Sequence, residues 1–205
     1  MSIGELLLQD SSKYGRSIPM AQDAQDLPAN VSRTMSTETA IETKLLLDHL
    51  RLQRRHVLGI LEGLDEGALR RPVLPSGWTC LGLVRHLAMD VEEFWFRAVT
   101  AADAAAIEEL AATGDNAWKV GGNLSAEEVF ARYRRECERA DAIVEATALD
   151  AVPAWWPAAE FGNRPVDSLR ETLLHVIAET ACHAGHLDVV RELIDGRKWN
   201  VMTAD

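Results

Sequence analysis

Apolar residues recur at steps of three and four over most of the chain, which is the spacing of one face of an α-helix. The pattern predicts four long amphipathic helices, over residues 36–63, 79–96, 125–148 and 167–195, and a short alanine-rich helix over 104–112. No segment between them shows a convincing strand pattern. The predicted fold class is therefore all-α, with the long helices packed as a four-helix bundle.

Capping residues support the helix boundaries. Thr79 is placed to cap the second helix, and Ser125 and Glu128 have the spacing of a capping box at the start of the third. Asp167 is expected to cap the fourth helix. The connections before the second and fourth helices contain Pro, Gly and Trp, which predicts loops there.

The chain divides into three parts by composition. Residues 1–36 are polar, without a sustained apolar period, and are expected to form a flexible leader. Residues 37–198 are predicted to be a single bundle domain, followed by a tail over 199–205. With 205 residues and 47% apolar content, the chain is long enough to bury one substantial core.

Charge and cysteine usage exclude several classes of protein. The net charge is -11 and no basic run appears, which argues against nucleic acid and against an anionic membrane surface as partners. The N-terminal apolar run is too short for a signal peptide or a membrane span. Cys80, Cys137 and Cys182 have no CxxC spacing, which favours free thiols in a reducing cytoplasm. Cys137 and Cys182 are both interpreted as packing residues.

The candidate chemistry lies on the fourth helix, where Glu179 and His183 are four residues apart. This spacing brings a carboxylate and an imidazole to one point, and zinc and related metals accept both as ligands. A solvated pair, or a carboxylate holding a core histidine, is the competing interpretation. A metal site needs a third ligand, for which His86 of the second helix is one candidate and His175 of the fourth helix another.

Three further histidines lie on the predicted fourth and first helices. His186 continues the line of Val176, Glu179 and His183, so these polar side chains are expected to point inward. The first helix carries two histidines among three arginines, which predicts a solvated or boundary face there; the residues are His49, Arg51, Arg54, Arg55 and His56.

Three segments resemble the DinB-like superfamily, in particular its mini-circle-protein-like branch, which is related to mycothiol-dependent maleylpyruvate isomerase-type metal enzymes. They are residues 75–87, the loop around Trp155 and Trp156, and residues 179–187, and the resemblance covers about residues 37–198. It implies a four-helix bundle, often dimeric, whose divalent metal is held by the residues matching the family's ligands, His86, Glu179 and His183. Many relatives have His in place of Glu179, whereas the isomerase branch is similar to this chain in its His, Glu, His set.

The resemblance implies a thiol-dependent S-transferase or isomerase that acts on small electrophilic molecules. The implied cofactors are a divalent metal, with zinc favoured and nickel second, and a low-molecular-weight thiol such as mycothiol or bacillithiol. The alternatives are a metal-dependent small-molecule hydrolase, a non-enzymatic metal-binding stress-related protein, and an interaction module without metal.

Supporting roles are assigned as hypotheses. Asp90 or Glu93 would support a ligand or act as a base, and His186 would orient a ligand or contact substrate. The competing interpretation for each is a solvated or capping polar residue. Three tryptophans at the entrances of the second and fourth helices are expected to line an apolar mouth near the metal: Trp78, Trp155 and Trp156.

Overall fold

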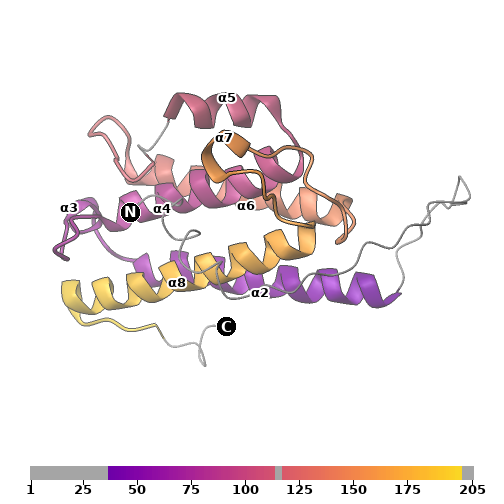
Figure 1. Cartoon of the computed structure of the whole chain (residues 1–205). Coiled ribbons are helices and arrows are strands. Elements are labelled where there is room, and N and C mark those ends of the chain that lie inside the picture. Colours follow the sequence, from indigo (N-terminus) through magenta and orange to yellow (C-terminus); the bar gives the residue numbers. More distant parts are fainter. Residues whose placement is uncertain (1–36, 114–116, 200–205) are drawn as a thin grey trace, which may run out of the picture.

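The computed structural model describes residues 37–113 and 117–199 (Figure 1). Within these ranges the regular secondary structure is helical and no strand occurs, so the predicted all-α class is confirmed. The expected leader, residues 1–36, lies outside the described residues, as does the tail from residue 200. The last described residue, Trp199, stacks on His56 at 4.9 Å between ring centroids.

Four long helical segments form the bundle, as predicted. They are α2 (Thr37–Leu61), α4 (Cys80–His86) continuing into η1 (Leu87–Thr100), α6 (Ala126–Ala146) and α8 (Leu169–Asp195). Three shorter helices lie in the connections: α3 (Glu66–Arg70), α5 (Ala104–Thr113) and α7 (Ala158–Phe161). The sequence pattern predicts α5 but not the one-turn helices α3 and α7, which are too short to show an apolar period.

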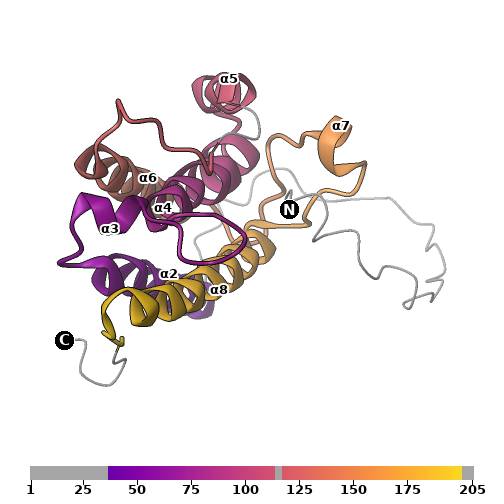
Figure 2. The ribbon, with the colours of Figure 1, turned by 90° about the vertical axis from the view of Figure 1, so that its left-hand side faces the viewer.

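Helices α2 and α8 lie side by side and run in the same direction (Figures 1 and 2). Near their starts, Arg170 donates to Glu42 at 2.6 Å, and near their ends Arg191 donates to the carbonyl of Ile60 at 2.8 Å. These two helices are the first and the last long helices of the described chain, so no single connection has to join them.

The segment α4–η1 and helix α6 form the second parallel pair. Glu93 contacts Arg132 and Arg97 contacts Glu136, and both pairs are 39 residues apart in sequence. This pair runs opposite to α8, because His86 at the end of α4 contacts Glu179 while Trp95, farther along η1, contacts His175. The end of α4 therefore faces the middle of α8.

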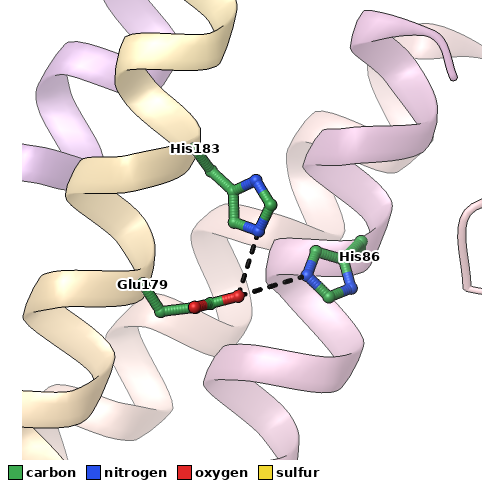
Figure 3. Close-up of side chains that lie close together, drawn as sticks. All are labelled: His86, Glu179 and His183. Carbon is green, nitrogen blue, oxygen red and sulfur yellow. Dashed lines mark hydrogen bonds and ion pairs between the residues drawn. The ribbon is translucent and has the colours of Figure 1, made fainter. Parts of the chain in front are cut away.

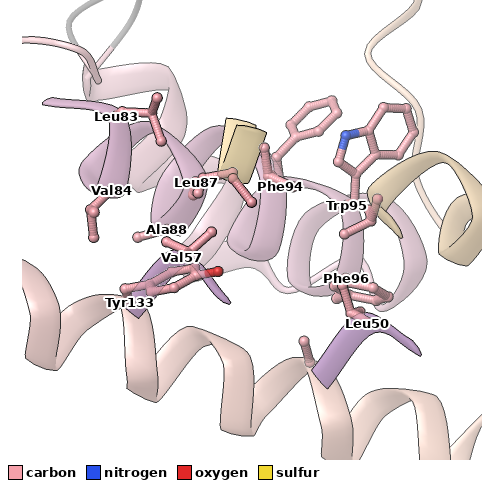
Figure 4. Close-up of a cluster of buried hydrophobic side chains, with 14 of the residues drawn as sticks. Leu50, Val57, Leu83, Val84, Leu87, Ala88, Phe94, Trp95, Phe96 and Tyr133 are labelled. Carbon is pink, nitrogen blue, oxygen red and sulfur yellow. The ribbon is translucent and has the colours of Figure 1, made fainter. Parts of the chain in front are cut away.

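The core lies between the two pairs of helices (Figure 4). Its largest fully buried side chains are Trp95, Tyr133 and Phe96, and Leu50 and Val57 of α2 reach it from the other pair. Full burial of such a side chain is worth roughly 1.5–3 kcal/mol each. This rigid interior carries the residues of the candidate site on its α4–α8 side.

Local capping explains where the helices begin. The Thr79 side chain accepts a hydrogen bond from the Gly82 amide, and Ser125 forms the predicted capping box with Glu128. The prediction that Asp167 caps the fourth helix is wrong. Ser168 is the cap, because its extended backbone lets its side chain accept from the Glu171 amide at 3.3 Å.

The second long helix departs from the sequence prediction in its pitch. From Leu87 it is a π-helix, which has backbone hydrogen bonds between residues i and i+5, and at its end the Ala101 amide donates in this way to the Phe96 carbonyl at 3.0 Å. It also extends beyond the predicted end at Phe96 to Thr100. The widened helix has 11 buried residues among its 14, so neighbours surround it on nearly every side.

None of the helices in the described ranges has an apolar stretch long enough to cross a lipid bilayer.

Candidate metal centre

Three side chains from two helices converge on one point, as the sequence predicts for a metal site (Figure 3). The His183 Nε2 atom lies 3.1 Å from Glu179 Oε1, and His86 Nε2 lies 4.0 Å from the same oxygen. All three donor atoms fall within 4.8 Å of one another. Among the described residues this is the one group of three or more potential ligands.

His86 is held rigidly at the end of α4. Only 2% of the residue is exposed, and its Nδ1 atom lies 2.8 Å from Asp90 Oδ2, one turn further along the helix. A carboxylate on Nδ1 directs the lone pair of the other ring nitrogen outward. That nitrogen, Nε2, is buried and has no hydrogen-bond partner. An imidazole nitrogen buried in this way costs free energy unless another partner, such as a cation, completes it.

Trp118 forms a wall of the site that sequence analysis did not assign. Its indole stacks on the His86 ring at 4.2 Å between centroids and meets the edge of the His183 ring at 5.7 Å. The Arg85 guanidinium anchors this segment by donating to the Ala117 carbonyl at 2.8 Å. The indole therefore shields one face of His86 from water.

Gly82 lets the Trp118 segment approach α4. A Cβ atom placed on Gly82 would lie 2.4 Å from the Trp118 carbonyl oxygen, which is closer than real Cβ contacts allow. A glycine inside a helix is otherwise unfavourable by about 1 kcal/mol relative to alanine. This glycine was the available sequence signal that another backbone packs closely against the helix.

His183 and His186 form the side of the site nearest the surface. The two Nδ1 atoms are 3.5 Å apart, and the Trp78 ring lies 6.4 Å from the His186 ring. The expectation that His186 points inward is wrong, because its position on α8 leaves it exposed. His186 nevertheless touches a candidate ligand, so it lies where a bound small molecule would meet the site.

The electrostatics of the three residues favour an ionised carboxylate. Hydrogen bonding with His183, together with the nearby His86, holds the pKa of Glu179 well below its usual range. Burial acts to lower the pKa of His86, but Asp90 and Glu179 outweigh it and raise that pKa above its usual value. The cluster therefore combines one negative charge with two imidazoles, a set that suits a divalent cation.

The donor set fits a divalent metal in chemistry and in spacing. Two imidazole nitrogens and one carboxylate oxygen are ligands that zinc accepts in open catalytic sites, at about 2.0–2.2 Å from the metal. Donors around a tetrahedral ion are then about 3.4 Å apart. The observed separations of 3.1 and 4.0 Å bracket that value, and the buried Nε2 atom of His86 lacks any other partner.

Two alternatives considered for the site lie elsewhere. His175, the other candidate ligand, packs its ring on Trp95 at 4.5 Å and is not part of the converging group. Glu93, the alternative to Asp90, is fully buried and bonded to Arg97 and Arg132. The π-helical pitch of η1 explains why Glu93 does not face the site. In an α-helix Glu93 would lie on the same side as His86, but the wider turns of a π-helix rotate it away.

The other two tryptophans predicted to lie near the metal, Trp155 and Trp156, pack farther along η1, beyond the contact between Trp95 and His175. Trp155 packs against Phe94 at 6.5 Å, and Trp156 packs against Trp95 at 6.2 Å. The Trp156 indole nitrogen donates to the Gly162 carbonyl at 2.7 Å. The structure thus places Trp78 beside His186, but Trp155 and Trp156 at the η1 end of the bundle.

The cysteines divide by environment. Cys80 is buried and burial raises the pKa of its thiol to about 11, while Cys137 lies partly buried against the core. The interpretation of Cys182 as a packing residue is wrong, because it is exposed on the outer face of α8. No cysteine belongs to the group of potential metal ligands among the described residues.

The bundle topology and the three converging donors define a DinB-like four-helix bundle with a candidate metal centre. The family model described as mycothiol-S-transferase (MST) matches residues 45–196, which is most of the chain. The chain therefore belongs to the mycothiol-S-transferase family, and the predicted DinB-like relationship is confirmed. No curated protein and no solved structure matches the chain in the corresponding searches.

Proposed function

We propose that this protein is a metal-dependent transferase that joins the sulfur of mycothiol to small electrophilic molecules. Membership of the mycothiol-S-transferase family supports the reaction class. The observation that carries the metal dependence is the buried, unpartnered Nε2 atom of His86, which faces Glu179 and His183 from the opposing helix (Figure 3).

In this proposal the metal is held by His86 Nε2, Glu179 and His183 Nε2, with zinc as the first candidate and nickel as the second. A divalent cation with an open position supplies a Lewis acid that favours loss of the proton from a coordinating thiol. Asp90 holds Nδ1 of His86 and so fixes the ring in the orientation that presents Nε2 to the site.

The residues at the surface end of the site would bind the substrate and accept the proton of the thiol. In a sulfur transfer the thiol loses its proton to a base, sulfur bonds to the electrophilic carbon, and the leaving group departs with the electron pair of the broken bond. We assign proton acceptance to His186, which is exposed and contacts His183. Trp78 lies beside it and would form an apolar wall for the thiol or the electrophile.

Trp155 and Trp156 are proposed to contact the substrate from the η1 end of the bundle. Their packing on Phe94 and Trp95 supports a connection to the site, since Trp95 contacts His175 one turn before Glu179. Replacing both tryptophans by alanine is expected to weaken substrate binding while leaving metal content unchanged.

Elemental analysis tests the metal centre directly. Tag-free protein purified without chelator is expected to carry about one equivalent of a divalent metal, and His86→Ala and His183→Ala are each expected to lose it, because two ligands hold a metal poorly. His49→Ala removes an exposed histidine of α2 and should retain the metal. A parent protein that stays metal-free after reconstitution would exclude the metal-dependent mechanism.

Turnover tests the transferase itself. The metal-loaded protein is incubated with mycothiol and a fluorogenic bimane electrophile, and the rate is compared with that of metal-stripped protein and of His186→Gln. We expect mycothiol-dependent conjugation that disappears without metal and falls in His186→Gln with metal content unchanged. Metal binding without any conjugation would leave a metal-binding protein and overturn the assignment as a transferase.

A further inference from the structure

A cluster of aromatic rings lies at the η1 end of the bundle, next to the candidate metal centre. The rings come from η1, from the loop that contains α7, and from α8. Neighbouring ring centroids are 4.5–6.5 Å apart, and the members of this aromatic cluster are Phe94, Trp95, Trp155, Trp156, Phe161 and His175. The two residues of η1 are buried, whereas the other four are only partly buried. A surface of aromatic side chains is typical of sites that bind small organic molecules.

Backbone hydrogen bonds hold the tryptophan loop against the end of η1. The Trp155 amide donates to the Val99 carbonyl at 3.1 Å, and the Ala154 amide donates to the Thr100 carbonyl at 3.4 Å. The loop rings are therefore fixed relative to the rings of η1.

His175 differs from the other rings of the aromatic cluster. Its ring packs on Trp95 at 4.5 Å, and no described residue forms a hydrogen bond or an ion pair with its nitrogens. Burial lowers the pKa of this imidazole despite the nearby charges of Glu179 and Glu171, so near neutral pH the ring is uncharged and carries one N–H donor. Packing on Trp95 makes no use of that donor. The ring therefore offers a hydrogen bond to a ligand held by the aromatic cluster.

His175 also lies next to the candidate metal ligands. On α8 it is followed at steps of four by Glu179 and His183, so it precedes Glu179 by about 6 Å along the helix. On the opposing helix, His86 contacts Glu179 and Trp95 contacts His175. A small molecule whose reacting carbon lies at the metal centre can thus reach the His175 ring and the aromatic cluster behind it.

We propose that the aromatic cluster binds the electrophile, and that His175 is a further catalytic residue, which donates a hydrogen bond to a substrate oxygen that becomes negatively charged when sulfur attacks. This inference rests on the proposed transferase function and deepens it, because it assigns the substrate class. The substrates are flat, apolar electrophiles whose broken bond leaves its electron pair on oxygen, such as aryl epoxides. The hydrophilic thiol approaches from the other side, past the exposed His186 and Trp78.

The opening of an aryl epoxide shows what His175 contributes. The thiolate sulfur bonds to one epoxide carbon, the bond from that carbon to oxygen breaks, and its electron pair passes to the oxygen. The N–H of His175 donates to this developing alkoxide, a role that a neutral imidazole can fill. The alkoxide then takes a proton from water, and His186 returns the proton of the thiol to water. The sole product is a hydroxy thioether.

Two electrophiles that share an aromatic ring test the role of His175. Styrene oxide leaves its electron pair on oxygen, whereas benzyl chloride releases chloride, which needs a hydrogen-bond donor far less. For the metal-loaded protein with mycothiol, we expect the ratio of the two kcat values, styrene oxide over benzyl chloride, to fall at least about 10-fold in His175→Phe. Removal of one such donor from a buried site costs about 100- to 1,000-fold in kcat. His175→Gln, which keeps an N–H donor, should restore most of the ratio.

His56→Phe is the matched control. His56 is also a partly buried histidine whose ring stacks on a tryptophan, Trp199, but it lies on α2 outside the site, so its replacement should leave the ratio unchanged. Helical content and metal content are measured for every variant, and His175→Leu is used if His175→Phe does not fold. An unchanged ratio in the folded His175 variant would overturn the catalytic role of this residue.

The possible outcomes separate this inference from the transferase assignment. If the parent protein conjugates the bimane electrophile but not styrene oxide, the transferase function stands and the substrate class is wrong. If it conjugates neither, the transferase function fails, and saturation-transfer NMR with the unreactive alcohol 1-phenylethanol tests the aromatic cluster by itself. Binding that weakens in His175→Phe and not in His56→Phe would support the cluster as a binding site. No binding, or equal binding in all three proteins, would overturn it.

Discussion

At the scale of single residues, the decisive feature is that the two ring nitrogens of His86 have different surroundings. Its Nδ1 atom is bound to Asp90 at 2.8 Å, whereas its Nε2 atom is buried and unpartnered. An ordinary core histidine would use both nitrogens, because a buried polar atom without a partner costs roughly 1–3 kcal/mol. The cost is accounted for if the ring is held ready for a cation between α4 and α8.

The variant Asp90→Asn tests whether the Asp90 carboxylate positions the His86 ring for metal binding. The amide is nearly isosteric but neutral and holds the imidazole less firmly, so we expect metal affinity to fall by roughly 10- to 100-fold without loss of the fold. Competition with a chromophoric chelator measures the affinity. Asp48→Asn, the same change at an exposed site on α2, is the control and should bind as tightly as the parent. An unchanged affinity in Asp90→Asn would show that the carboxylate has no role in positioning His86.

The candidate ligands could be predicted from sequence to different degrees. Glu179 and His183 follow from helical spacing alone, because four residues on one helix always bring two side chains together. His86 needed a prediction of which helices face each other, supplied by the bundle and by resemblance. Trp118 could not be predicted, because it lies in an irregular connection whose path depends on tertiary contacts with Arg85 and Gly82.

At the scale of helices, the starts of the second and third long helices were predicted correctly, but the pitch of the second was not. Thr79 and the Ser125 capping box mark helix starts through local hydrogen bonds, which depend on only a few residues. The π-helical pitch of η1 reflects contacts on nearly all its sides and leaves no trace in an apolar period. This pitch matters for the site, because α-helical spacing continued beyond His86 wrongly places Glu93 on the same side of the helix as His86.

Gly82→Ala tests the contact between α4 and the Trp118 segment. The added methyl group would lie 2.4 Å from the Trp118 carbonyl, so the segment must move away and uncover His86. We expect a loss of about 1–3 kcal/mol in the free energy of unfolding, together with weaker metal binding. Gly122→Ala, where a Cβ atom meets nothing within 4 Å, should leave both unchanged. Thermal denaturation and metal titration of the two variants make the comparison, and equal behaviour would show that the segment adapts without cost.

At the scale of the whole molecule, the candidate metal site is carried by a bundle whose two pairs of helices are joined by buried charged residues. Arg54 of α2 donates to Glu92 of η1 through two hydrogen bonds of 2.7 and 2.6 Å, and it also contacts Asp141 of α6 at 2.5 Å. The prediction of a solvated or boundary face for this part of α2 is wrong for Arg54, which is only 5% exposed. Helical spacing could not distinguish it from its neighbour Arg55, since the partners come from two other helices.

Arg54→Ala should therefore be far more damaging than Arg55→Ala. Removing Arg54 leaves Glu92, which is 1% exposed, as an unpaired buried charge, and we expect a loss of about 3–5 kcal/mol in the free energy of unfolding. Arg55 is exposed, and its removal should change stability by no more than about 0.5 kcal/mol. Urea denaturation of the metal-free proteins measures both.

The double variant Arg54→Met, Glu92→Met distinguishes two causes of the lower free energy of unfolding in Arg54→Ala. If the cost comes from leaving a charge buried alone, replacing both partners by apolar side chains of similar length should recover most of the stability lost in Arg54→Ala. If the double variant is as unstable as Arg54→Ala, the lost stability comes instead from the bond between Arg54 and Asp141 of α6. In either case α4 and α8 should still bind metal at temperatures where the variant is folded, because neither residue touches the His86, Glu179 and His183 group.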